Sequence, residues 1–234
     1  MAKNSSVKSI SIGVGLATGL YGISFGALSV AAGLDIWQTQ VLSLLMFSGG
    51  SQFAFVGVIA AAGGAGVATA GVGAAIISAW LLGIRNGFYA VRLAPILKRV
   101  GFGKLIPAML TIDESTAVAT SQAEHSNQVK GFWFTGIAVF VFWNLMTLAG
   151  AILGDALGDP SRWGLDAAAA AAFLGLLWPR LAERQALAVG AAALVIATSA
   201  TPFLSAGVPV LLAGVAAIAV GIFNWFAPKS GDAK

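Results

Sequence analysis

The sequence predicts an all-α integral membrane protein, a polytopic helix bundle with six to eight membrane segments. Hydrophobic residues make up 58% of the 234 residues and charged residues only 9%, whereas a soluble domain carries about 25% charged residues. So few charges cannot cover a water-facing surface. Apolar runs that approach the roughly 20 helical residues of a bilayer span recur along the chain. We therefore expect one transmembrane domain over residues 1–234, with short cytoplasmic tails at 1–9 and 228–234.

The apolar segments are separated by short glycine-rich, proline-containing or charged stretches. The first follows a short basic N-terminus and is too long for the core of a signal peptide, so we expect it to be a retained membrane helix. The segments cover residues 10–33, 38–61, 70–92, 105–123, 131–154, 167–179, 185–201 and 206–227.

The distribution of lysine and arginine predicts the orientation, because short cytoplasmic loops carry an excess of both. Both chain ends are basic, as are the 93–106 loop and the Arg180–Arg184 loop, so all four are expected in the cytoplasm. The 155–166 loop is mainly acidic and is expected outside. The sequence thus predicts a multi-pass protein of the bacterial inner membrane with both termini cytoplasmic.

Counting the spans shows that two segments are unusual. If all eight cross, the basic 93–106 loop falls outside, against the charge rule. If 38–61 and 105–123 both fail to cross, every basic loop lies inside. Both segments contain polar or helix-breaking residues. We favour two broken or re-entrant segments; the alternative is eight plain helices with one exception to the rule.

The stretch Ser48-Gly49-Gly50-Ser51-Gln52 interrupts the 38–61 segment. Adjacent glycines let a helix unwind, which frees backbone groups to bind a polar ligand, and helix N-termini favour anions. The alternative is a close helix crossing built from small residues. Gln52 argues against packing alone, because a buried amide needs partners. All five residues are candidate substrate-binding residues.

Asp113 and Glu114 lie inside the 105–123 segment. An ionised carboxylate is costly in a low dielectric and tends to take up a proton, as a proton-coupled carrier requires. Two solvated acids in the first turns of an interfacial helix remain an equal alternative, because negative charge suits that helix end. Both are candidate proton-coupling residues.

Arg85, Asn86, Tyr89 and Arg92 lie near the predicted cytoplasmic end of the 70–92 segment. Spacings of four and three place Arg85, Tyr89 and Arg92 on one helical face. Arg92 fits a basic anchor at the membrane surface. Arg85 lies about two turns deeper and is the better partner for an acid or a substrate carboxylate, so Arg85 and Asn86 join the candidate binding residues.

Other classes of function lack support in the sequence. Cysteine is absent and His125 is the single histidine, which excludes a thiolate or multi-histidine metal site. No nucleotide, phosphate-loop or hydrolase motif occurs, so neither an enzyme nor a cofactor is predicted. The net charge of +4 arises from basic residues scattered between apolar runs, which is typical of membrane topology and not of nucleic-acid binding.

Three stretches in order resemble the AzlC family, the larger subunit of branched-chain amino acid exporters. They are Ser48-Gly49-Gly50-Ser51-Gln52-Phe53, Leu82-Gly83-Ile84-Arg85-Asn86-Gly87-Phe88-Tyr89-Ala90 and Leu110-Thr111-Ile112-Asp113-Glu114-Ser115. The resemblance extends over about residues 10–200. In one respect the chain departs from it: family members usually have Arg-His preceded by Asn in the third helix, and here the order is Arg85-Asn86.

The resemblance implies export of valine, leucine, isoleucine or a similar aliphatic amino acid, together with a small membrane subunit of the AzlD type. With the embedded acids, it suggests a proton-coupled secondary transporter. Two alternatives remain open: a passive channel for small solutes, and a structural membrane subunit without its own transport site.

Overall fold

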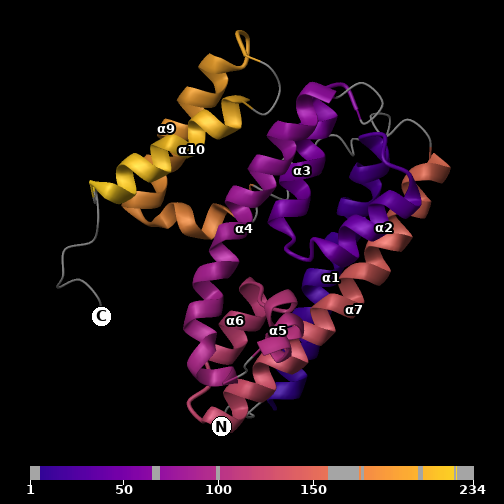
Figure 1. The fold of residues 1–234 in the computed structure, drawn as a ribbon, viewed down its shortest axis with the longest axis vertical. Helices are drawn as coiled ribbons and strands as arrows, with labels where there is room; N and C mark the ends of the chain where they lie inside the picture. The colour runs from indigo at the N-terminus through magenta and orange to yellow at the C-terminus, as the bar shows by residue number, and fades with distance from the viewer. Residues whose placement is uncertain are drawn as a thin grey trace.

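The computed structural model describes residues 6–64, 69–98, 101–157, 174, 177–204, 208–223 and 225, and every element in these residues is helical. Figure 1 shows the elements in space. They are α1 (Val7–Ala31), α2 (Ile36–Leu45), α3 (Gly50–Ala61), α4 (Thr69–Leu97), η1 (Gly101–Lys104), α5 (Leu105–Met109), α6 (Asp113–Thr120), α7 (His125–Leu157), η3 (Trp178–Ala182), α9 (Arg184–Ala200) and α10 (Val208–Ile222).

Three helices in the described residues are long and apolar enough to cross a membrane, namely α1, most of α4 and α7. The shorter apolar helices are α3, α9 and α10. The helical fold is therefore as predicted, whereas six to eight membrane segments stays a prediction. The expected segment 167–179 lies mostly outside the described residues.

Helices α1 and α7 pack closely side by side and run parallel. A Cβ at Gly15 would lie 2.6 Å from the Cβ of Ala138, and one at Gly19 would lie 2.6 Å from that of Phe142. Further along, Gly26 meets the backbone of Thr147. Small residues allow this approach because no side chain separates the two backbones. The pair forms a tightly packed wall against which the shorter helices lie.

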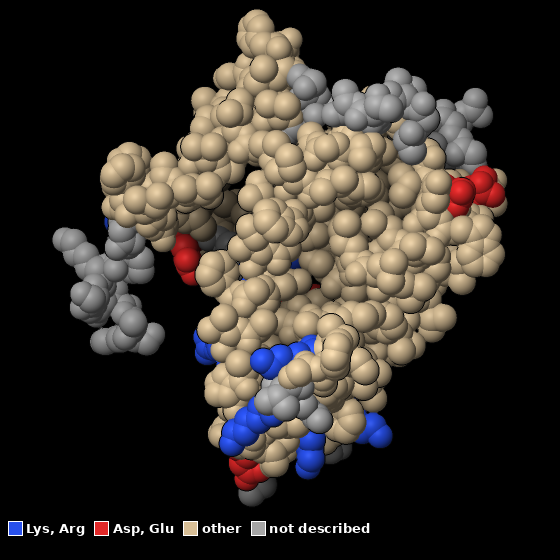
Figure 2. Space-filling model, viewed as in Figure 1, with Lys and Arg blue, Asp and Glu red and all other residues tan. Residues whose placement is uncertain are grey.

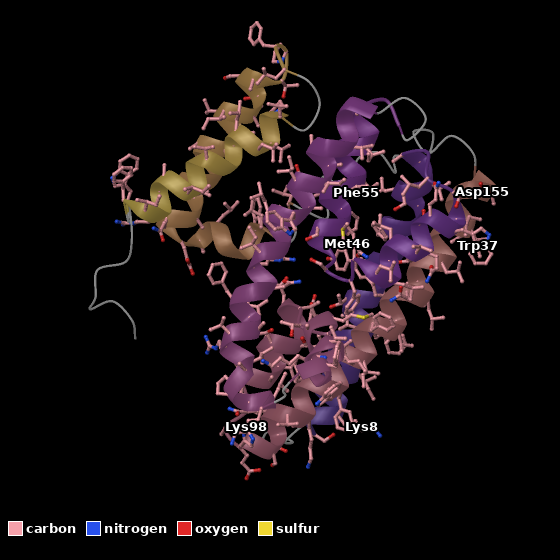
Figure 3. The ribbon with its side chains drawn as sticks, viewed as in Figure 1. Lys8, Trp37, Met46, Phe55, Lys98 and Asp155 are labelled. Atoms are coloured by element: carbon pink, nitrogen blue, oxygen red, sulfur yellow. The ribbon has the colours of Figure 1, made fainter. Side chains whose placement is uncertain are left out.

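The segment 38–61 is interrupted as predicted. Helix α2 begins with a capping box in which Asp35 accepts from the Gln38 backbone, and it ends at Leu45. Residues 46–49 are not helical, and α3 begins at Gly50. Figure 3 shows the chain entering from Trp37 to Met46 at mid-height and returning past Phe55. We call α2 and α3 the first hairpin.

The segment 105–123 is also interrupted. Helix α5 ends at Met109, residues 110–112 are not helical, and α6 begins at Asp113. In Figure 1, α5 and α6 lie in the half of the molecule that carries the N label, and α2 and α3 lie in the other half. We call α5 and α6 the second hairpin. Neither segment is therefore one uninterrupted helix, and the choice between crossing and non-crossing segments stays a prediction.

Basic residues gather at one end of the molecule (Figure 2). Lys8 and Lys98 lie at one end, and Trp37 and Asp155 lie at the other (Figure 3). Figure 2 shows blue basic residues gathered at the first end, while most of the surface between is free of charge. The start of α1 and the loop after α4 therefore share one end of the molecule, as the predicted topology with two non-crossing segments demands.

Helices α9 and α10 pack on each other beside α4 (Figure 1), and α10 contacts α4. All the predicted site residues lie in α1 to α7 and the breaks between these helices.

Candidate functional site at the two helix breaks

The two breaks meet at one cavity of about 390 Å³. Its polar lining consists of Thr18, Tyr21, Ser48, Arg85, Asp113 and Glu114, with the backbone of Gly49 and Gly50. Its apolar lining consists of Phe47, Phe53, Leu82, Ile112, Val139, Trp143 and Leu177. A cavity of this size with a few convergent polar groups is typical of a small-molecule site.

Arg85 links the two hairpins. Its Nη2 donates to the carbonyl oxygen of Ser48 at 3.2 Å, in the break of the first hairpin. The same nitrogen lies 3.0 Å from Oδ2 of Asp113, at the break of the second. Arg85 and Asp113 keep 36% and 35% of their side chains exposed, so the pair is open to the cavity. The structure thus brings three of the predicted site residues into one contact network.

Tyr89 completes the surroundings of Asp113. It lies one turn beyond Arg85 on α4, and its hydroxyl donates to Oδ1 of Asp113. Both carboxylate oxygens of Asp113 therefore have a partner on the same face of α4, as the predicted spacing of four requires. Asp113 is held as one half of an ion pair.

Glu114 has a different environment, although it is the next residue. Thr18 of α1 approaches its Oε1 at 3.5 Å, which is at the outer limit of a hydrogen bond. Among the described residues no ion pair to Glu114 falls within 4 Å, whereas Asp113 has Arg85. The two acids, which the sequence could not separate, therefore differ: Asp113 is neutralised by its pair and Glu114 is not.

The N-terminus of α3 opens onto the same cavity. Gly49, the N-cap, has φ 54°, a left-handed conformation that glycine adopts without strain. No side-chain cap hydrogen bond closes this helix end within the described residues. A Cβ at Gly50 would lie 3.1 Å from Nη2 of Arg85, so glycine lets the guanidinium approach the helix end.

The N-terminus of α6 is built differently. The hydroxyl of Ser115 accepts from the N–H of Ile112 at 3.1 Å and donates to the carbonyl of Leu110 at 2.6 Å. Asp113 and Glu114 occupy the first turn, where negative charge offsets the helix dipole. One helix end facing the cavity is thus uncapped and free of acids, and the other carries two.

Three predicted site residues have their side chains elsewhere. Gln52 is fully buried, and its Nε2 donates to the carbonyls of Leu42 at 3.4 Å and Ser43 at 3.2 Å. It therefore joins α3 to the end of α2 without lining the cavity. Ser51 hydrogen-bonds Ser48 at 2.8 Å between hydroxyl oxygens, and Asn86 is absent from the cavity lining.

Sequence analysis missed other cavity residues. Thr18 and Tyr21 come from α1, where they are ordinary members of an apolar helix with no local motif. Trp143 and Val139 come from α7, which sequence analysis did not connect with the breaks. The signal that could have found the α1 residues is their place beside Gly19 and Gly22, the face that packs on α7.

A second, more open apolar groove of about 770 Å³ lies beside the cavity. Phe47 and Ser48 line both. The groove runs along α4 past Trp80 and Ile84 and reaches the ends of α2 and α5 at Leu45 and Met109. It therefore brings the non-helical backbone of the first hairpin next to the outer surface.

The chemistry of the cavity is that of polar recognition. It holds one cationic and two anionic side chains against an aromatic wall. No group of three metal-ligating side chains occurs among the described residues. The arrangement can bind a small molecule that has charged groups of both signs and an apolar part.

Comparison with known families agrees with the three sequence motifs. No curated protein and no solved structure matches the chain. A family model described as AzlC protein matches residues 13–157, which is more than half of the chain and includes most of α1 and all of α2 to α7 with both breaks. The matched region ends at the last residue of α7, so it contains nearly all the residues that line the cavity. With its long apolar helices, the chain is a membrane protein that belongs to the AzlC family.

Proposed function

We propose that this protein is a secondary transporter subunit that exports branched-chain or similar aliphatic amino acids across the bacterial inner membrane. Membership of the AzlC family supports a role in membrane transport. The observation that carries the proposal is the cavity in which Arg85, Asp113 and Glu114 face an aromatic wall at the meeting point of two broken helices. Broken helices near the membrane midplane are a common site of substrate binding in transporters.

The two helix ends suggest how an amino acid binds. The uncapped end of α3, with Arg85 beside it, suits the substrate carboxylate. The ammonium group then faces the acidic end of α6. Phe47, Phe53 and Trp143 offer an apolar surface to the aliphatic side chain. The zwitterion and its side chain thereby match three distinct parts of the lining.

Proton coupling is the second part of the proposal. A proton carrier has to change its charge during the cycle, and an acid fixed in an ion pair does so at the cost of the pair. Asp113 has Arg85 and Tyr89 as partners. Glu114 has the distant hydroxyl of Thr18. Glu114 is therefore the better candidate for carrying the proton, and Asp113 the better candidate for positioning Arg85.

A small AzlD-type membrane subunit is the proposed partner. Lipid cannot satisfy polar backbone groups, so irregular backbone inside a membrane is tolerated only where protein or a water-filled cavity surrounds it. The open groove exposes residues beside the break at Met46 to Ser48, with Leu45 79% and Trp80 73% exposed. An apolar helix of the partner would cover this backbone. In the same proposal both chain termini are cytoplasmic, on the side of the basic end.

Efflux of labelled valine from loaded cells tests the proposal. Cells that carry the protein with its partner should export valine faster than cells without them, and Asp113→Asn and Glu114→Gln should each slow export. Glu124→Gln is the matched control, because Glu124 is exposed just before α7 and is not part of the cavity lining. If both cavity variants export at the normal rate, the acids carry no proton and that assignment is wrong.

A passive channel is separated from a carrier by the form of the flux. In proteoliposomes, a carrier saturates at millimolar valine and accumulates it against a gradient when a proton gradient is imposed. A channel does neither. A subunit without a transport site would show altered complex yield, and no other change, when Gly49 or Gly50 is substituted.

A further inference from the structure

We propose that the coupling proton and the cationic group of the substrate share one binding group, the carboxylate of Glu114, and therefore bind in alternation. This inference rests on the proposed function, since it takes the substrate to be an amino acid. It adds what the family and the motifs do not supply: the physical reason why entry of a proton would expel a substrate from the site.

The charge balance of the cavity is the first argument. Arg85 and Asp113 form an ion pair at 3.0 Å, so together they contribute no net charge. Glu114 then leaves the cavity with one uncompensated negative charge. An unpaired charge in a confined, low-dielectric site is costly, and it is relieved by a proton or by a cation. A zwitterion supplies the cation, and its own carboxylate needs a separate partner.

The groups around Glu114 are the second argument. Thr18 of α1 approaches Glu114, Tyr21 of α1 and Arg85 of α4 line the same cavity, Tyr89 of α4 donates to Asp113, and Asp113 precedes Glu114 on α6. From α7 the cavity receives only Val139 and Trp143, which do not titrate. The one cation in this set is Arg85, and Asp113 and the Ser48 carbonyl occupy its Nη2. Arg85 attracts Glu114 electrostatically, but its ion pair is with Asp113, and no described cavity cation lies within ion-pair distance of Glu114.

The exclusion follows from the chemistry of one carboxyl group. When an ammonium group binds, the O–H bond of the Glu114 carboxyl group breaks, its proton leaves to water, and the carboxylate pairs with the substrate. When a proton returns, the carboxyl group becomes neutral and the ammonium loses its partner. Nothing is oxidised or reduced in either direction. Proton and substrate thus exchange at one carboxyl group, and the two therefore cross the membrane in opposite directions.

Proton release on binding is the direct test. Purified protein with its partner is mixed with L-leucine in detergent and weak buffer, near the pH at which Glu114 is protonated in the empty site. Bound leucine and the pH of the solution are both recorded. We expect the release to approach one proton per leucine bound as the pH is lowered. Once the empty site is protonated, the apparent affinity for leucine should fall about tenfold for each unit by which the pH is lowered further, because each binding event then displaces one proton. Glu114→Gln should bind leucine without release, and Asp113→Asn should retain release even where its affinity is lower.

Ligand analogues keep the test decisive should Glu114→Gln fail to fold. Isopentylamine, which has the cationic group and the side chain without the carboxylate, should release a proton from the unmodified protein. 4-Methylpentanoate, which lacks the ammonium group, should release none. Equal proton release by these two analogues would overturn the inference. So would leucine binding without proton release at every pH, or undiminished proton release from Glu114→Gln. Failure of leucine to bind or to be transported at all would instead overturn the proposed substrate.

Discussion

The two hairpins are alike in shape and opposite in chemistry. Each consists of a short helix, a non-helical break and a second short helix, and each break lines the same cavity. They enter from opposite ends of the molecule (Figure 1). At the break, the first hairpin reads Ser48-Gly49-Gly50-Ser51 and the second reads Ile112-Asp113-Glu114-Ser115. By helix position, Gly49 and Gly50 are the N-cap and first residue of α3, whereas Ile112 and Asp113 hold those places in α6 and Glu114 follows.

This difference teaches how one cavity can recognise both ends of a zwitterion. A helix N-terminus carries a partial positive charge, which glycine leaves uncompensated and a carboxylate reverses. In the first hairpin the charge remains available, and Arg85 adds to it. In the second, Asp113 and Glu114 turn the same backbone feature into a negative surface. Similar backbones therefore present opposite charges to one ligand.

Removing the link between the hairpins should have the largest effect. Arg85→Met deletes the bond to the Ser48 carbonyl and leaves Asp113 without its cation. We expect valine efflux to fall by roughly 100-fold, since hydrogen bonds to charged groups contribute about 1.5–3 kcal/mol each. Arg92→Met is the matched control, because Arg92 lies two turns further on α4 and is exposed. Equal losses in the two variants would contradict a role of Arg85 in the cavity.

Making the two helix ends alike should have the next largest effect. Gly50→Asp places a carboxylate at the end of α3, near Nη2 of Arg85, where it competes with Asp113 and repels a substrate carboxylate. We expect efflux to fall by about 10–100-fold, more than for Gly50→Asn, which has nearly the same size without the charge. If the two variants transport equally, bulk and not charge at this helix end limits transport, and the assigned polarity is wrong.

Much of this site could be predicted from sequence. The breaks followed from Gly49-Gly50 and from the acids in an apolar segment, since both features are costly in an unbroken membrane helix. The spacing of Arg85 and Tyr89 predicted a shared face, and both contact Asp113. The glycines of α1 bring that helix close to α7, and nothing in the sequence identifies α7 as the partner.

The rest depended on tertiary contacts that one chain does not encode locally. Nothing around Thr18 or Trp143 in the sequence indicates that α1 and α7 would enclose the breaks. The acids Asp113 and Glu114 are neighbours, and only the position of α4 makes one paired and the other not. Gln52 was expected to bind a ligand because a buried amide needs partners; its Nε2 finds them in the α2 carbonyls, while its Oε1 has none among the described residues, so the binding role stays a prediction.

The backbone of the first break is the next point of comparison. Gly49 has φ 54°, which a residue with a Cβ adopts only with strain, whereas Ile112 at the second break is extended. Gly49→Ala should therefore lower the stability of the purified protein by about 1–3 kcal/mol, measured as a fall in thermal midpoint. Ile112→Ala removes a buried side chain without backbone strain. If Gly49→Ala leaves the thermal midpoint unchanged, the backbone conformation assigned to the first break is wrong.

The smallest effect should come from the two serines that follow the breaks. Ser115 satisfies the Ile112 N–H and the Leu110 carbonyl, both buried, so Ser115→Ala should cost about 1–2 kcal/mol of stability. Ser51 bonds only the Ser48 hydroxyl among its described hydrogen-bond partners, and Ser48 faces the cavity, where water can replace it. Ser51→Ala should therefore cost less than half as much in the same thermal unfolding measurement. Equal losses of stability would mean that side-chain hydrogen bonds hold the first break as firmly as the second. That result would remove the structural reason for treating the glycine end as the one left open to the substrate.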